Sequence, residues 1–185
     1  EFGRLLQRYE RSLQIGKDEY FESDELSDIA EYYYDKKEKP RAEYVLDYAM
    51  HLHPGAVLPL VFKARIALID EKNIEKARYY ASLISDVYDI DCLYLKAEIL
   101  IAEDKPEEAS SFLRNAMDNI DEDNVPDYVL DVATIFIDYG LADIAAEWLA
   151  MSDEDDLQDY REIKARIAFA KGDYEKSEKL FEQLL

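Results

Sequence analysis

Apolar positions recur along the chain with the period of amphipathic helices, and the helical stripes come in pairs. Leu26, Ile29, Ala30 and Tyr33 have the i, i+3, i+4, i+7 spacing that places four side chains on one face of a helix. A polar break, "KKEKP", follows, and a second apolar stripe runs through residues 42–49. This order predicts two antiparallel helices joined by a short turn.

Small residues occupy the same two places in each predicted helix pair. The first series is Ala30, Ala64, Ala97, Ala133 and Ala165, and the second follows it by 12 or 13 positions at Ala42, Ala77, Ala109, Ala145 and Ser177. The period is about 34 residues, which is typical of stacked helix pairs. The phrase Lys-Ala-Arg-Ile-Ala at 63–67 accordingly returns at 164–168, three periods later. Small side chains at both places are expected to let the helices approach closely.

The periodicity predicts an all-α fold, an α-α superhelix in which neighbouring pairs stack to bury a continuous core. Residues 1–22 are expected to form an amino-terminal capping helix and a linker; the alternative for 1–15 is the second helix of a further repeat. The array is expected over 23–185, with pairs at about 23–56, 57–89, 90–125, 126–157 and 158–185. The final segment, "KLFEQLL", ends on apolar residues, which favours an array truncated at its carboxyl end.

These positions resemble the tetratricopeptide repeat (TPR), whose pattern is W-x2-L-G-x2-Y, A-x3-F and P over 34 residues. The first period matches at Leu26, Ile29, Ala30, Tyr33, Ala42, Leu46, Ala49 and Pro54. The third matches at Leu93, Ala97, Leu100, Ala109, Leu113 and Ala116, and the fifth at Ala165, Ser177 and Phe181. The resemblance covers about five repeats over 23–185, is of bacterial type, and implies a right-handed solenoid.

The chain departs from the family pattern in several places. No repeat has the signature Trp, only the first has the closing Pro, and the second carries one extra residue in its turn, "IDEKN". Lys63, Lys96 and Lys164 stand where Leu is usual, and we expect their stems to pack while their ammonium groups stay in water. Gly140 and Gly172 lie at two of the predicted turns, where a helix end favours a left-handed residue.

Charge restricts the kind of partner. The chain has 22 Lys and Arg against 43 Asp and Glu, a net charge of −21, which disfavours nucleic acid and anionic membranes. No apolar stretch reaches about 18 residues, so no transmembrane helix is expected. Cys92 is the only cysteine, which excludes an intrachain disulfide and is compatible with a cytoplasmic protein.

The search for reactive chemistry predicts neither an enzyme nor a cofactor or metal site. The five glycines are isolated, so no phosphate-binding loop is present. The candidate metal ligands His51, His53 and Cys92 do not form a cluster in the sequence. The acidic segments 121–127 and 153–156 begin like calcium loops but have Val125 and Leu157 where an oxygen ligand is required. We expect both segments to be solvated, helix-capping linkers.

Aromatic residues are abundant, with 15 tyrosines and one tryptophan. Tyr33 lies on the apolar stripe of its predicted helix and is expected in the core, whereas Tyr34 is expected to face a binding groove. For Trp148, packing between repeats is favoured over a role as an interface anchor.

The resemblance implies a concave groove formed by the first helix of each pair. Carried over by register, the groove positions are Ser27, Glu31 and Tyr34; Val61, Arg65 and Leu68; Tyr94, Glu98 and Ile101; Leu130, Thr134 and Ile137; and Glu162, Arg166 and Phe169. Some family members clamp an acidic carboxy-terminal peptide with Lys, Asn and Arg. The clamp positions here hold Ser27, Glu31, Phe62, Asp91 and Leu95, so that specificity is excluded.

The function that follows is a non-enzymatic adaptor or scaffold that binds a protein or peptide segment in this groove. The acidic chain favours a neutral or basic segment. The alternatives are a regulatory or assembly region of a longer protein, whose effector domain would lie beyond residue 185, and self-association through the carboxy-terminal face.

Overall fold

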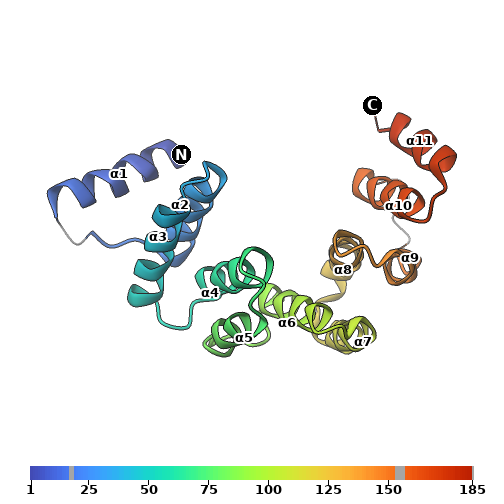
Figure 1. The fold of residues 1–185 in the computed structure, drawn as a ribbon, viewed down its shortest axis with the longest axis horizontal. Helices are drawn as coiled ribbons and strands as arrows, with labels where there is room; N and C mark the ends of the chain where they lie inside the picture. The colour runs from blue at the N-terminus through green and yellow to red at the C-terminus, as the bar shows by residue number, and fades with distance from the viewer. Residues whose placement is uncertain (17–18, 153–156, 185) are drawn as a thin grey trace. The chain divides into compact units, whose positions relative to one another are not determined.

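The computed structural model describes residues 1–16, 19–152 and 157–184, and these residues form helices and connecting turns without any strand (Figure 1). The prediction of an all-α protein is confirmed. The helices are α1 Phe2–Ile15, α2 Ser23–Asp35, α3 Lys39–Leu52, α4 Val57–Arg65, η1 Ile66–Asp70, α5 Ile74–Ser82, α6 Ile90–Ala102, α7 Pro106–Ala116, η2 Met117–Asn119, η3 Glu122–Asn124, α8 Val125–Asp138, α9 Ala142–Leu149, α10 Gln158–Ala170 and α11 Tyr174–Glu182.

The chain divides into two compact units, and the boundary falls within α6. The N-terminal unit is Glu1–Leu95 and the C-terminal unit is Lys96–Leu185. In the N-terminal unit, α1 packs on the first helix pair: Tyr9 is buried against Phe21 with ring centroids 5.7 Å apart, and the Tyr33 hydroxyl donates to Glu10 over 3.0 Å.

Five turns between paired helices share one backbone conformation. The left-handed residues are Lys37, Lys72, Asp104, Gly140 and Gly172, with φ between 54° and 81°. Each lies five positions before the second small residue of its pair. In four of the turns the next N–H donates to the carbonyl five residues back, as from Glu38 to Tyr33 over 2.9 Å. These bonds satisfy carbonyl groups that the helix ends would otherwise leave without a partner.

The extra residue of the second pair lies within the helix and not within the turn, which corrects the expectation from the sequence. The left-handed residue follows the first small residue by seven positions in four pairs, but by eight between Ala64 and Lys72. The helix absorbs this residue as the π-helical segment η1, in which Glu71 N–H donates to Ile66 O over 3.2 Å. The turn itself keeps its length: Lys72 precedes Ala77 by five positions, the spacing found in the other four pairs.

Every position of the two small-residue series is buried. The nine alanines are 0% exposed and Ser177 is 3% exposed. The Ser177 hydroxyl donates to the carbonyl of Ala165 over 3.0 Å, so the last pair is joined at its small-residue contact by a hydrogen bond. The burial expected of residues at close helix contacts is therefore confirmed for both series.

We predict that Ala133→Leu destabilises the C-terminal unit by about 1–3 kcal/mol, because a larger side chain overpacks a fully buried site. Ala133 is 0% exposed. Ala170→Leu is the matched control, since Ala170 is an exposed alanine near the end of a neighbouring helix, α10. Equal urea midpoints for the two variants would contradict the packing role of the series.

Lys63 differs from the expectation that its ammonium group stays in water. Its side chain is only 8% exposed, and Nζ lies 2.8 Å from Asp47 of α3, whose side chain is 62% exposed. The buried cation is thus balanced by a carboxylate at the surface, and the pair joins α3 to α4. Lys164 is half-buried, with Nζ 5.2 Å from the centre of the Tyr160 ring.

Candidate functional site

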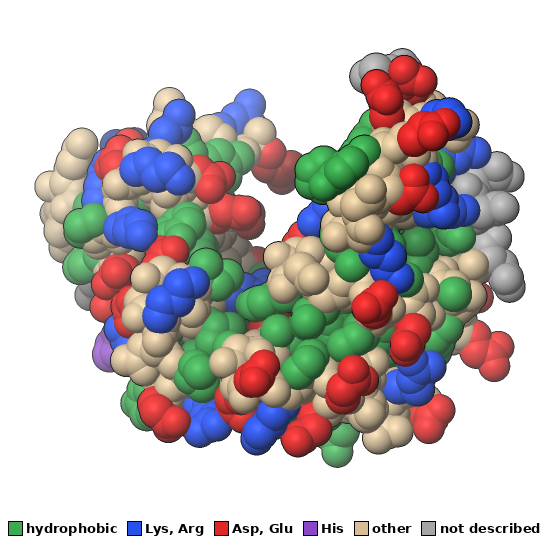
Figure 2. Space-filling model, turned by 45° about the vertical axis from the view of Figure 1, so that its right-hand side comes forward, with side chains coloured by type: hydrophobic (Ala, Val, Ile, Leu, Met, Phe, Trp, Pro, Cys, Tyr) green, Lys and Arg blue, Asp and Glu red, His purple; other side chains and the backbone are tan. Residues whose placement is uncertain are grey.

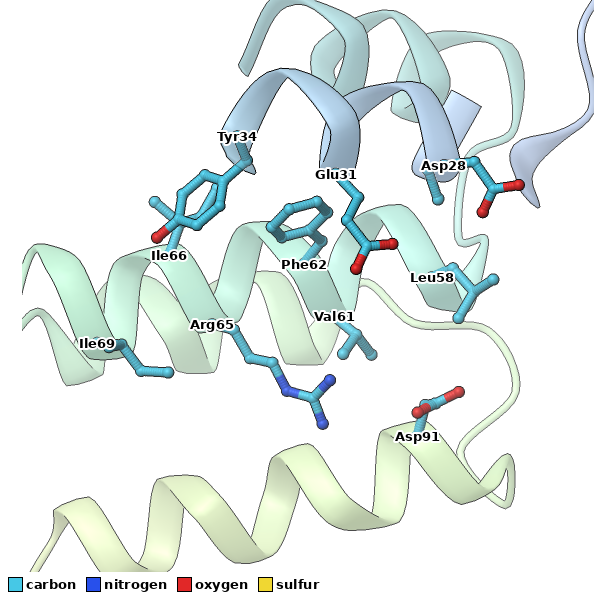
Figure 3. Close-up of a pocket in the computed structure, with 11 residues that line it drawn as sticks. Asp28, Glu31, Tyr34, Leu58, Val61, Phe62, Arg65, Ile66, Ile69 and Asp91 are labelled. Carbon is cyan, nitrogen blue, oxygen red and sulfur yellow. The ribbon is translucent and has the colours of Figure 1, made fainter. Parts of the chain in front are cut away.

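A pocket of about 490 Å³ opens in the N-terminal unit between α2, α4, η1 and the start of α6 (Figure 3). We name it the α2–α4 pocket. Its lining residues are Ser27, Asp28, Glu31 and Tyr34 of α2, Leu58, Val61, Phe62 and Arg65 of α4, Ile66 and Ile69 of η1, and Asp91 of α6. Its volume is within the range of protein sites that hold a small molecule or several side chains of a peptide.

One end of the pocket is apolar and aromatic. The rings of Tyr34 and Phe62 meet edge to face, with centroids 5.5 Å apart and planes at 69°. Ile66 is buried behind them, whereas Ile69 is 50% exposed and lies on the same side of the pocket in Figure 3. This end offers an apolar surface to which a partner's side chain can bind without displacing core residues.

The π-helical segment places Ile69 and Asp70 at the pocket. Asp70 accepts hydrogen bonds from the Tyr34 hydroxyl and from Lys39 Nζ, each over 2.7 Å. These bonds, from Lys39 first and Tyr34 second, hold the pKa of the Asp70 carboxyl below its usual range. The hydrogen bond that the Tyr34 hydroxyl donates to Asp70 also raises the pKa of Tyr34. The contact therefore fixes the Tyr34 ring and ties α2 and α3 to η1.

We predict that Asp70→Asn lowers stability near neutral pH and that the difference from wild type disappears in acid. A carboxyl whose pKa is depressed by folding stabilises the folded state above its unfolded pKa, about 3.9, and loses this effect as pH falls through the folded value. Urea unfolding of both chains across the acidic range measures the difference. Asp35→Asn, an exposed change on α2, is the control. A difference that is independent of pH would contradict the role of the charge.

Carboxylates dominate the polar lining of the pocket. Asp28, Glu31 and Asp91 make no side-chain hydrogen bond or ion pair with any residue that the structure describes. Arg65 is the cation of the lining and extends from α4 toward the start of α6 in Figure 3. Acidic side chains elsewhere are scattered, with Lys and Arg between them, over the face shown in Figure 2. The pocket thus combines an apolar wall with carboxylates that have no cation of their own.

The pocket brings together five of the groove residues predicted from the sequence: Ser27, Glu31, Tyr34, Val61 and Arg65. Phe62 and Asp91, which occupy two of the family's clamp positions, also line it. The prediction missed Asp28, Leu58, Ile66 and Ile69. Asp28 follows the predicted Ser27 on α2, and Leu58 lies three residues before the predicted Val61 on α4. The position of Ile69, in contrast, depends on the π-helical segment η1, which no residue pattern indicates.

The other predicted groove residues lie outside this pocket. Leu68, Tyr94, Glu98, Leu130 and Ile137 are buried, and Ile101 and Thr134 are half-buried. In the C-terminal unit, Glu162 is exposed, Arg166 pairs with Asp138, and Phe169 is 60% exposed with its ring 5.4 Å from that of Tyr174.

A smaller pocket of about 310 Å³ lies in the C-terminal unit between α9, α10 and α11. Lys164, Lys171 and Lys176 line it, but Lys171 Nζ already contacts Asp143 over 2.7 Å, and Lys164 lies over Tyr160. Its cations are therefore partly engaged within the protein, unlike the carboxylates of the α2–α4 pocket.

The described part of the chain contains no group of three or more His, Cys, Asp and Glu side chains arranged to hold a metal ion. Of the acidic segments considered as calcium loops, Glu122–Asn124 forms the short helix η3 leading into α8, and 153–156 lies outside the described residues. None of the described helices is both long enough and apolar enough to cross a membrane.

Comparison of the chain with protein-family profiles, with curated proteins and with solved structures found no match.

Proposed function

We propose that this chain is a non-enzymatic adaptor or scaffold that binds a segment of another protein in the α2–α4 pocket. The observation that carries the proposal is the convergence of five residues, expected on a groove from their register, onto one pocket with an apolar wall and a polar rim. Surface pockets of this kind bind peptides through one or two apolar anchors, and the polar rim sets specificity.

We further assign the chain to the tetratricopeptide-type helical repeats, with helix pairs stacked as a right-handed superhelix. The support is the period of about 34 residues, the burial of both small-residue series, and the shared left-handed turn. The buried thiol of Cys92 is compatible with a reducing compartment, and we place the protein in the cytoplasm.

The experiment is a random peptide display selection on the wild-type chain and on two variants. Ile69→Glu puts a charge on the apolar end of the pocket; Ile69 is 50% exposed, so the fold should tolerate the change. Leu83→Glu makes the same change at a residue that is 42% exposed and lies outside the pocket. We expect wild type and Leu83→Glu to enrich one family of sequences, which Ile69→Glu binds at least about tenfold more weakly. Equal binding by all three, or no enrichment, would contradict the proposal.

A further inference from the structure

We infer that the α2–α4 pocket selects a peptide segment that carries an apolar or aromatic anchor and, a few residues away, a Lys or Arg side chain. This inference rests on the proposed function and specifies the partner's chemistry. The anchor binds at the end formed by Tyr34, Phe62 and Ile69, and the basic side chain binds at the end formed by Asp28 and Asp91.

The two ends are separate because α2 and α4 run in the same direction across the pocket (Figure 3). Asp28 and Leu58 lie toward the amino ends of these helices, whereas Tyr34 lies near the carboxyl end of α2 and Ile69 lies in η1, which continues α4. Asp91, the second residue of α6, lies at the same end as Leu58. The carboxylates Asp28 and Asp91 therefore share one end of the pocket with Leu58, and the other end, with Tyr34 and Ile69, carries no carboxylate of the described lining.

Helix geometry sets the distance between the two ends. At about 1.5 Å per residue, the separation is about 9 Å along α2, from Asp28 to Tyr34, and about 16 Å along α4 and η1, from Leu58 to Ile69. An extended peptide rises about 3.3 Å per residue. An anchor at one end and a cation at the other would therefore be about three to five residues apart in an extended ligand.

Charge determines which side chain suits the acidic end. Among the lining residues that the structure describes, three are carboxylates, and the one cation, Arg65, has interactions of its own within the protein. Asp28 and Asp91 have no ion pair in the described residues, so a ligand cation would be their first such partner. A ligand carboxylate at the same place would meet like charges. The net charge of −21 adds a long-range attraction for cations, but it does not distinguish one site from another.

The apolar end is prepared for an anchor before any ligand binds. The hydrogen bond from Tyr34 to Asp70 and the edge-to-face contact with Phe62 hold the aromatic pair in place. Ile69, at the same end, is 50% exposed and can be covered by a ligand side chain. Because the Tyr34 and Phe62 rings already have fixed partners, covering them costs little conformational entropy.

The test compares peptide display selections on wild type and on the double variant Asp28→Lys/Asp91→Lys. Neither residue is buried, so circular dichroism should show an unchanged helix content. We expect wild type to enrich a Lys or Arg about three to five residues from an apolar anchor. The double variant should retain the anchor and prefer Asp or Glu at that position, with a change in preference of about tenfold. Glu1→Lys/Asp35→Lys, which changes the net charge equally outside the pocket, should keep the wild-type preference.

Two results would overturn the inference while leaving peptide binding intact. One is enrichment of apolar anchors in wild type without a preference for Lys or Arg. The other is a shift from Lys or Arg to Asp or Glu that occurs equally in Asp28→Lys/Asp91→Lys and in the control Glu1→Lys/Asp35→Lys. The net charge, and not the pocket, would then explain the shift. Failure of the proposed function gives a different result: no enriched family responds to Ile69→Glu.

Discussion

Replacing Trp148 with alanine is expected to destabilise the C-terminal unit by about 3–5 kcal/mol, the usual cost of deleting a large buried aromatic side chain. Trp148 is 0% exposed and lies on α9. Its ring centre is 6.2 Å from that of Tyr128 on α8, and its Nε1–H donates to Ser110 Oγ on α7 over 2.9 Å. The indole thus joins three helices, and its removal leaves a cavity and an unpaired hydroxyl. Urea unfolding followed by circular dichroism measures the loss.

Two further variants separate packing from hydrogen bonding. Ser110→Ala leaves the ring in place but removes the acceptor of a buried N–H, which should cost about 1–3 kcal/mol. Phe181→Ala shortens an aromatic side chain that is 41% exposed on α11 and should cost much less than Trp148→Ala. If Trp148→Ala were no more destabilising than Phe181→Ala, Trp148 would be an interface residue rather than a core residue.

Deleting Ile69 is expected to weaken binding of the enriched peptides by about 30-fold, or about 2 kcal/mol. The deletion shortens the spacing from Ala64 to the left-handed Lys72 from eight positions to seven, the spacing found in the other four pairs. The backbone can then close as an ordinary α-helix, so we expect the chain to fold. The pocket, however, loses an apolar side chain, and Asp70 is moved away from Tyr34.

The control for the deletion is Ile69→Ala, which keeps the extra residue and shortens only the side chain. It should weaken binding by about 1 kcal/mol, or roughly fivefold. Fluorescence anisotropy with a labelled peptide from the selection compares the variants. Binding of the deletion variant at wild-type affinity would show that the π-helical segment does not shape the site.

The all-α fold could be predicted because positions that are buried at helix contacts require small or apolar residues, and these residues recur with a helical period in the sequence. Ala97 and Ala133 belong to the series of small residues predicted at helix contacts, and the structure buries both completely. Glycine marks the left-handed turns at Gly140 and Gly172, but Lys37 and Asp104 adopt the same conformation without such a signal. At those positions the hydrogen bonds of the turn hold an ordinary residue in a less favoured conformation.

About half of the pocket could be predicted, because regular helical register places Glu31, Tyr34 and Arg65 on one face. The rest depends on an irregularity. A single inserted residue can be accommodated in a turn or in a helix, and the sequence "IDEKN" indicated the turn. The structure places it in the helix, which brings Ile69 into the pocket and Asp70 against Tyr34.

The most direct test of the central claim, that the α2–α4 pocket is the binding site, is to map backbone amide chemical shifts of the isotope-labelled full chain. A peptide from the wild-type selection would be titrated into it. We predict that the largest shifts fall within residues 27–34, 58–69 and around Asp91, and that Ile69→Glu abolishes them at the same peptide concentration. Largest shifts elsewhere in the chain, or shifts that persist in Ile69→Glu, would contradict the claim.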